Sequence, residues 1–286
     1  MAEPLAFDPR VTPARPDLAA EALRGRVEAA RYVTPLCRRV ATGAVAMRAR
    51  PDATAPYDTE LLFGEEVALL DTDAGWAWAQ SAADGYVGYL PAGALAEAPQ
   101  PTHRVTALIA RLYARPALKS PPVASLHLGA LVGVLDREED YAQLACGNWI
   151  PVDHLCPVDH AAPDWVAVAE GFVGVPYLWG GRSPAGLDCS ALVQLARQAA
   201  GHRCPRDSDM QSGLGETVAA GAPLCRGDLV FWKGHVGIML DAGRLLHATA
   251  HRMVTQIEPL AEARARIAAH EFGEVVRIAR LDPDGD

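Results

Sequence analysis

The chain has 286 residues, of which 50% are hydrophobic and 21% charged, a composition typical of globular proteins and long enough for two or three domains. The formal net charge of −9 argues against nucleic acid or another anionic polymer as a partner. No stretch reaches the roughly eighteen consecutive apolar residues that a membrane helix needs, so we expect no membrane partner.

Residues 1–40 begin with a proline-rich segment that lacks the basic start and apolar run of a secretory signal peptide. On this ground we expect a cytoplasmic protein. The residues from Leu18 to Val27 predict a helix that contains Leu23. We therefore expect an extended arm with a short helix, packed on the domains that follow it.

Residues 41–158 contain an internal repeat. At a constant offset, the matching pairs are Ala49-Arg50-Pro51 with Ala114-Arg115-Pro116, Gly64 with Gly129, Val67 with Val132, Leu70-Asp71 with Leu135-Asp136, and Trp76 with Tyr141. Each copy is a series of short strand patterns separated by turn residues, as a small barrel requires. The two copies resemble bacterial SH3-type domains, over residues 41–98 and 103–158.

The stretch from Pro176 to Ser190 is a loop rich in glycine and proline that leads into a helix. Asp188 is a suitable N-cap residue, which places Cys189 in the first helical turn. Unpaired backbone N–H groups and the helix dipole favour a thiolate there and lower the thiol pKa. The pattern predicts a nucleophile, and the alternative is that Cys189 is a small buried core residue.

Two histidines follow on predicted antiparallel strands. Residues 227–232 and 235–240 predict a hairpin through Lys233-Gly234, and a further turn leads into a strand that carries His247. His235 therefore begins one strand and His247 lies on its neighbour. A cysteine at a helix N-terminus opposite two such histidines is the arrangement that nucleophilic cysteine catalysis needs.

These motifs together resemble the NlpC/P60 family of cell-wall peptidases. The motifs that carry the resemblance, in family order, are Pro176-Tyr177-Leu178-Trp179-Gly180-Gly181, Leu187-Asp188-Cys189-Ser190, Gly227-Asp228-Leu229-Val230-Phe231-Trp232 with His235-Val236-Gly237-Ile238, and Leu246-His247-Ala248. The resemblance implies an α+β fold in which a papain-like catalytic domain, residues 163–286, follows the two small SH3-like barrels.

The resemblance also implies the roles of the catalytic residues. Cys189 is the expected nucleophile, His235 the general base and His247 the residue that orients it. Tyr177 is expected near the oxyanion region, where the Cys189 backbone N–H also points. Trp179 is expected either in the cleft wall or in the core, since its size suits both.

Members with N-terminal SH3-type domains recycle wall peptides in the cytoplasm. The resemblance therefore implies hydrolysis of the γ-D-glutamyl–diamino acid bond in murein peptides with a free N-terminal L-Ala. Selecting a free amine requires buried anionic and hydrogen-bonding groups. Asp188, Glu65 and Tyr86 are the candidates for this role. The resemblance implies that Asp207 and Ser208 lie near the α-carboxylate of D-Glu, with Arg206 and Ser208 as donors, and Ser190 is a further candidate substrate-binding residue. The alternative roles are helix capping for Asp188, solvent exposure for Glu65, core packing for Tyr86 and an ordinary polar loop for residues 206–208.

The six cysteines show no CxxC pair or metal-ligand spacing, so we expect reduced thiols, no metal and no cofactor. Two other functions remain open. One is a thiol amidase or acyltransferase that acts on another amide, and the other is a catalytically silent peptidoglycan-binding protein. The sequence does not distinguish meso-diaminopimelate from Lys as the third residue of the stem peptide.

Overall fold

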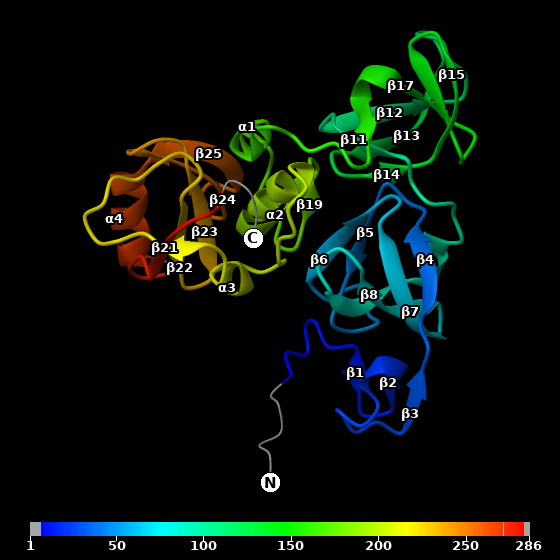
Figure 1. Ribbon diagram of the computed structural model, residues 1–286, viewed down its shortest axis with the longest axis horizontal. Helices are drawn as coiled ribbons and strands as arrows, with labels where there is room; N and C mark the ends of the chain where they lie inside the picture. The colour runs from blue at the N-terminus through cyan, green and yellow to red at the C-terminus, as the bar shows by residue number, and fades with distance from the viewer. Residues whose placement is uncertain (1–6, 271, 283–286) are drawn as a thin grey trace.

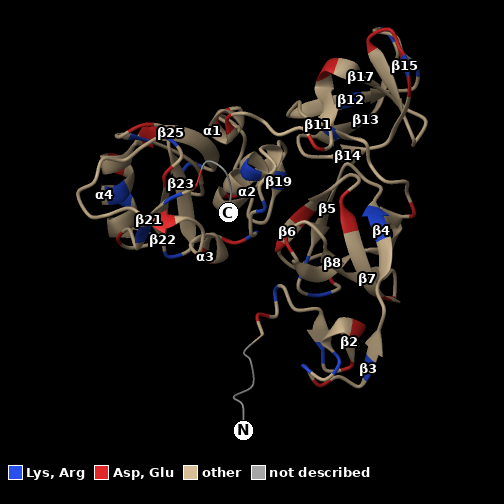
Figure 2. Ribbon diagram, viewed as in Figure 1, with Lys and Arg blue, Asp and Glu red and all other residues tan. Residues whose placement is uncertain are grey.

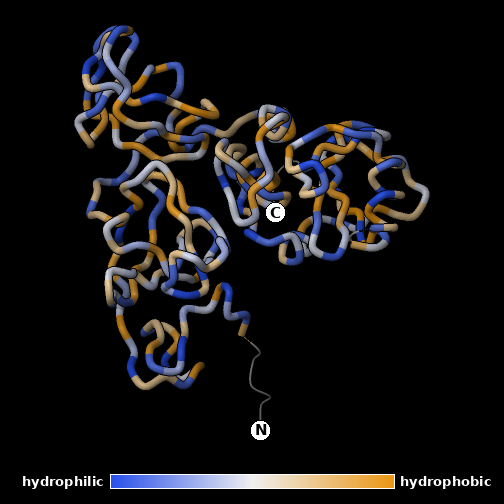
Figure 3. Tube along the Cα trace, turned by 180° about the vertical axis from the view of Figure 1, so that it is seen from behind, coloured by the Kyte–Doolittle hydropathy of each residue, from blue (hydrophilic) through white to orange (hydrophobic). Residues whose placement is uncertain are grey.

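The computed structural model describes residues 7–270 and 272–282. The N-terminal segment and two strand-rich parts follow one another along one side of the molecule, and the catalytic domain lies beside them (Figure 1). Hydrophobic and hydrophilic stretches alternate along the chain in all of these parts (Figure 3), and residues of both charges are spread over them (Figure 2). Among the described residues, no helix is long and apolar enough to cross a membrane.

The N-terminal segment forms a small sheet, so the helix predicted from Leu18 to Val27 is wrong. The sheet pairs β1 (Ala14–Arg15) with β2 (Leu18–Ala20) and β2 with β3 (Arg31–Val33), and the only helical turn in this stretch of the described chain is the 3-10 helix Glu21–Leu23. The side chains of β2 are buried, and two of them pack on Trp78. Strand pairing and this packing override the local helix preference.

The first β-unit covers residues 36–96. Its elements are β4 (Leu36–Val40), β5 (Ala44–Met47), β6 (Thr59–Leu62), β7 (Glu66–Asp73), β8 (Trp76–Ser81), β9 (Val87–Pro91), a 3-10 helix (Ala92–Ala94) and β10 (Leu95–Ala96). Five strands form a sheet of order β10-β4-β7-β8-β9, and β5 pairs with β6. β4 thus belongs to this unit although the sequence assigned it to the arm. The sheet pairings end at β10 and β9 and do not by themselves establish a closed barrel.

The second β-unit covers residues 103–157 and repeats the first. Its elements are β11 (His103–Val105), β12 (Ile109–Tyr113), β13 (Pro122–His127), β14 (Leu131–Val132), β15 (Val134–Glu138), β16 (Tyr141–Leu144), β17 (Trp149–Pro151), a 3-10 helix (Val152–His154) and β18 (Leu155–Pro157). Trp76 and Tyr141 begin corresponding strands, and Pro91 and Pro151 precede corresponding 3-10 helices. The structure therefore agrees with the repeat read from the sequence.

The catalytic domain is an antiparallel sheet between helices. Its helices are α1 (Trp165–Glu170), α2 (Cys189–Ala199), α3 (Ser208–Gln211) and α4 (Leu260–His270). Its strands are β19 (Arg182–Ser183), β20 (Gly186–Leu187), β21 (Glu216–Thr217), β22 (Leu229–Trp232), β23 (His235–Met239), β24 (Arg244–Thr249), β25 (Val254–Pro259) and β26 (Arg277–Arg280). The main sheet has the order β21-β26-β22-β23-β24-β25.

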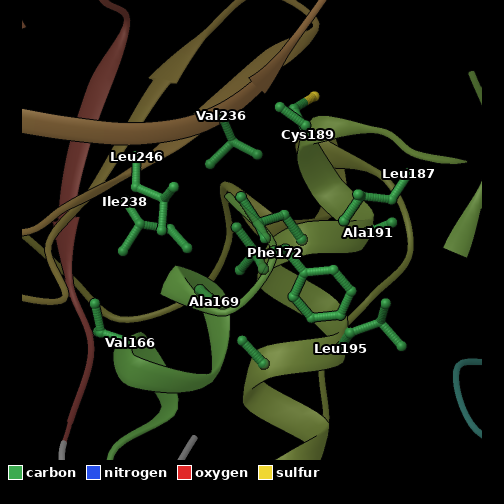
Figure 4. Close-up of a cluster of buried hydrophobic side chains, with 14 of the residues drawn as sticks. Val166, Ala169, Phe172, Leu187, Cys189, Ala191, Leu195, Val236, Ile238 and Leu246 are labelled. Atoms are coloured by element: carbon green, nitrogen blue, oxygen red, sulfur yellow. The ribbon is translucent and has the colours of Figure 1, made fainter. Parts of the chain in front are cut away.

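Alternation along these strands separates two apolar layers. Val236 and Ile238 face α1 and α2, whereas Met239 and Leu245 face α4. Figure 4 shows the first layer, with Cys189 at its upper end beside Val236. Successive side chains of a strand point to opposite faces, so α1 and α2 cover one face of the sheet and α4 covers the other.

The first β-unit docks on the catalytic domain through a buried ion pair. Arg182 is 0% exposed, and its guanidinium donates to both Glu65 carboxylate oxygens at 3.0 Å. The Arg182 backbone N–H donates to the Glu60 carboxylate at 2.8 Å. A buried charge requires an opposite charge beside it, and Glu65 supplies it to Arg182, so these contacts fix the two parts relative to each other.

The second β-unit contacts the opposite end of α2. Arg104 donates to the carbonyl oxygens of Gln198 at 3.0 Å and Ala199 at 3.4 Å. The last carbonyl groups of a helix have no partner within the helix, and a cation is favourable beside them. Both β-units therefore hold the helix that begins with Cys189.

Candidate active site

Cys189 begins α2 as the sequence predicts. The Asp188 carboxylate accepts a hydrogen bond from the Ala191 N–H at 2.9 Å, which caps the helix. The Cys189 side chain is 7% exposed, and its sulfur accepts hydrogen bonds from the backbone N–H groups of Ser190 and Val236. These contacts hold the thiol beside Val236, near the start of β23 (Figure 4).

The expectation of a lowered thiol pKa is wrong for the protein without substrate. Burial, followed by the negative charge of Asp188, raises the pKa of Cys189 to about 12. The two backbone hydrogen bonds act in the opposite direction but are weaker. The resting nucleophile is therefore a neutral thiol, because desolvation of the thiolate outweighs the helix N-terminus.

The two predicted histidines contact each other. His235 begins β23 directly after Gly234, whose φ of +85° allows the tight turn from β22, and His247 lies on β24. The Nε2 atom of His235 lies 2.9 Å from Nδ1 of His247. This contact leaves Nδ1 of His235 as the ring nitrogen available to the Cys189 thiol.

Aromatic rings enclose His235. Phe272 stacks on it at a centroid distance of 5.6 Å, and Trp232 lies at the same distance in a tilted orientation. Burial, followed by the proximity of His247, lowers the pKa of His235 well below 6.5. His235 is therefore neutral at neutral pH and can accept a proton from the thiol.

His247 in turn contacts Glu258 on β25, a residue that the sequence analysis did not single out. Its Oε1 atom lies 2.7 Å from Nε2 of His247, and Arg266 of α4 donates to the same carboxylate. Hydrogen bonding to His247 lowers the pKa of Glu258 to about 2, so the carboxylate is ionised. The alternating pattern of Gln256 and Glu258 on a strand next to His247 was the one available sequence signal.

These pKa directions predict the pH dependence of the enzyme. In a reaction in which His235 takes the proton of the Cys189 thiol, His235 must be neutral, so kcat/KM should fall with decreasing pH only below 6.5, through the depressed pKa of this residue. Because the pKa of Cys189 is raised to about 12, no loss from thiol ionisation should occur up to about pH 10. A pH–rate profile measures both limbs. An acid limb centred above pH 6.5 would contradict the assignment of neutral His235.

Three of the predicted substrate-binding residues form a buried network instead. Arg206 donates to both oxygens of Asp188, at 2.9 and 2.7 Å, and to the Ser190 hydroxyl at 2.8 Å. Asp188 also accepts from the Gly180 N–H, and Arg206 donates to Thr59 of the first β-unit. Since these groups satisfy one another, the geometry favours a role in fixing the nucleophile's helix over direct contact with substrate.

Asp207 and Tyr86 meet where the first β-unit adjoins α3. The Tyr86 hydroxyl donates to Asp207 Oδ2 at 3.2 Å. The same oxygen accepts from Arg10 of the N-terminal segment at 2.8 Å, a contact that sequence reasoning missed. Burial raises the pKa values of Tyr86 and Asp207, and Ser208 follows as the first residue of α3.

Glu65 does not join this group. Its carboxylate is bound by Arg182 and by the Leu62 N–H, so no oxygen of this buried residue is directed to the site. Tyr177, in contrast, lies near Cys189. Tyr177 is half-buried, and burial followed by the charge of Cys189 raises its pKa.

Trp179 is 64% exposed, which excludes it from the core. The adjacent loop lies against the first β-unit, where a Cβ on Gly180 would come within 2.6 Å of the Tyr57 side chain. Trp179 therefore stands at the boundary between the catalytic domain and this unit. All six cysteines are free, and the described residues contain no group of three or more His, Cys, Asp or Glu side chains placed to hold a metal ion.

Comparison with known proteins identifies two parts of the chain. Residues 174–270 match the NlpC/P60 family, and residues 47–95 match the bacterial dipeptidyl-peptidase Sh3 domain. The matched NlpC/P60 segment contains Cys189, His235, His247 and Glu258.

Two relatives extend over most of the chain. The γ-D-glutamyl-L-lysine dipeptidyl-peptidase of Bacillus cereus is 26% identical, over 71% of this chain and 70% of its own length. The enzyme of the same description from Bacillus subtilis is 28% identical, over 66% of this chain and 71% of its own. A γ-DL-glutamyl hydrolase of Bacillus subtilis is 39% identical but matches only 32% of this chain and 24% of its own.

A solved structure shows the same fold. The crystal structure of an NlpC/P60 family protein from Bacillus cereus superimposes with a TM-score of 0.73 and 20% identity, over 86% of this chain and 99% of that one. The chain is thus a cysteine peptidase with an NlpC/P60 domain behind a bacterial dipeptidyl-peptidase SH3 domain.

Proposed function

We propose that this peptidase hydrolyses the γ-D-glutamyl–diamino acid bond of murein stem peptides that carry a free N-terminal L-Ala. The observation that carries the proposal is the contact of Tyr86 with Asp207, an acidic and partly buried group between the first β-unit and α3, directly after Arg206, which binds the N-cap of the Cys189 helix. The names of the two Bacillus γ-D-glutamyl-L-lysine dipeptidyl-peptidases support a γ-D-glutamyl bond. The proposal includes a role in recycling cell-wall peptides in the cytoplasm.

The chemistry follows from the order of the catalytic groups. Nδ1 of His235 takes the proton of the Cys189 thiol as the sulfur attacks the carbonyl carbon of γ-D-Glu. The same imidazole then gives that proton to the leaving amine of the diamino acid, and a thioester remains. Water adds to the thioester with His235 as base, which releases the dipeptide and restores the thiol. The Cys189 backbone N–H and Tyr177 are the proposed donors to the oxyanion.

The free amine of the substrate is proposed to bind Asp207. Tyr86 and Arg10 both contact Oδ2 of this carboxylate, so Oδ1 is the proposed acceptor for the ammonium group. Burial, followed by the nearby charge of Asp207, raises the pKa of Asp58, so a second carboxyl group lies close to Asp207. An acetylated amine carries no positive charge and cannot bind Oδ1 as an ammonium group, so it should be rejected.

Two peptides test the bond and the amine together. L-Ala-γ-D-Glu-meso-diaminopimelate should be cleaved at the γ-D-Glu bond, and the N-acetylated peptide should not, as measured by mass spectrometry. Asp207→Asn should raise KM for the free peptide by about 10- to 100-fold, the value of one charged hydrogen bond. Asp209→Asn is the matched control, because Asp209 is exposed and its side chain also pairs with Arg10.

Three results would change the proposal. Equal cleavage of both peptides would remove the amine-binding role of Asp207. Equal KM changes in the two variants would assign the effect to Arg10 rather than to substrate. Cleavage of neither peptide would favour a thiol amidase or acyltransferase acting on another amide.

A further inference from the structure

A continuous chain of polar contacts extends behind the nucleophile. It runs from His235 on β23 to His247 on β24, Glu258 on β25 and Arg266 on α4, and it begins next to Val236, whose backbone N–H contacts the Cys189 sulfur. The described contacts of this chain all lie within the catalytic domain. Glu258 is separated from the sulfur by two imidazole rings, so any effect on the reaction must pass through the histidines.

We propose that Glu258 is a positioning residue for catalysis, which fixes the tautomer of both histidines and strengthens His235 as a base. The inference requires only that Cys189 acts as the nucleophile of a peptidase. It does not depend on which amide bond is cut.

The tautomers follow from the donor and acceptor at each contact. An ionised carboxylate can only accept, so Nε2 of His247 must carry the proton that points to Glu258. A base for the thiol needs an unprotonated Nδ1 on His235, so Nε2 of His235 carries the proton and donates to Nδ1 of His247 across 2.9 Å.

Burial makes this arrangement necessary. His247 is 0% exposed, so water cannot reorient its ring or supply a partner for its Nε2 proton. With Glu258 removed, the opposite tautomer of His247 becomes available, and it would turn His235 so that its proton faces the sulfur. In a Ser-His-Asp triad, loss of the carboxylate likewise leaves the histidine in the wrong tautomer and lowers kcat.

Burial is the main cause of the lowered pKa of His235, and two charged side chains add opposite effects. Arg266 lowers this pKa further, as does the neighbouring His247, whereas Glu258 raises it. When His235 becomes positively charged during thiol attack, Glu258 stabilises it through His247. Arg266 donates a hydrogen bond to the Glu258 carboxylate and so holds it in place. Its positive charge lowers the pKa of His235, whereas the charge of Glu258 raises it.

Isosteric variants separate these effects. Glu258→Gln should lower kcat by about tenfold or more at unchanged KM, and should move the acid limb of the pH profile to lower pH by about one unit. Glu258→Asp keeps the charge and should retain the acid limb near its wild-type position. Arg266→Met should move the acid limb to higher pH, because its charge depresses the pKa of His235.

A second readout needs no peptide substrate. Iodoacetamide labelling of the Cys189 tryptic peptide, followed by mass spectrometry at pH 7, should be about tenfold slower in Glu258→Gln, since a weaker base leaves more sulfur protonated. Glu262→Gln, the same change at an exposed position of α4, should equal wild type. This labelling distinguishes failure of the inference from failure of the proposed bond specificity.

A structural role alone would give a different pattern. Glu258→Gln and Arg266→Met would then shift the acid limb in the same direction or not at all, and their losses of kcat would follow their losses of thermal stability. Wild-type kcat and labelling in Glu258→Gln would also overturn the inference.

Discussion

Replacement of Cys189 by Ala is expected to lower turnover of the stem peptide by roughly 10⁴-fold or more, because no other group near His235 can form the covalent intermediate. The fold should persist. The removed sulfur is small, and the helix cap formed by Asp188 and Ala191 does not use it. Peptide cleavage followed by mass spectrometry measures the loss, and circular dichroism checks the fold.

Cys204→Ala provides the matched control for this experiment. Cys204 is also buried, and its sulfur accepts a hydrogen bond from Gln211 rather than lying beside a histidine. Burial raises the pKa values of both thiols to about 12. Reactivity should therefore depend on the neighbouring base, and Cys204→Ala should keep its activity. Equal turnover in wild type and Cys189→Ala would end the assignment of the nucleophile.

The largest expected effect on stability is that of Arg182→Ala. Arg182 is fully buried and pairs with both oxygens of Glu65, so its removal leaves an uncompensated buried carboxylate. Loss of one partner of such a pair costs about 3–5 kcal/mol. Urea unfolding should show a lower midpoint, and activity should fall because the first β-unit loses its main anchor.

A double replacement separates charge from packing. Arg182→Met combined with Glu65→Leu removes both charges with similar volumes, and it should recover much of the stability lost in Arg182→Ala. Arg24→Ala, at an exposed pair with Glu21, should leave the midpoint unchanged. An unchanged midpoint in Arg182→Ala would show that the ion pair does not hold the interface.

Local patterns were enough to predict the centre of the site. The N-cap at Asp188 placed Cys189 at the start of α2, and turn residues such as Gly234 located the strands of His235 and His247. The internal repeat predicted two similar β-units. These features depend on residues close in sequence, whose preferences agree with the final fold.

The remaining features depend on contacts between distant parts of the chain. The helix predicted from Leu18 is replaced by a strand that packs on Trp78, and Glu65 is taken by Arg182. The pKa of Cys189 is set by burial, which no local pattern reveals. Arg10 lies far in sequence from its partner Asp207, so its contribution becomes visible only in three dimensions.

Both ends of α2 are held from outside the catalytic domain. At its start, Arg206 links Asp188 to Thr59 of the first β-unit, and at its end Arg104 of the second β-unit binds the last carbonyl groups. An α-helix of 11 residues is stiff along its axis. Replacing Arg104 in the second β-unit should therefore change the alignment of Cys189 with His235, although Arg104 contacts only the far end of the helix.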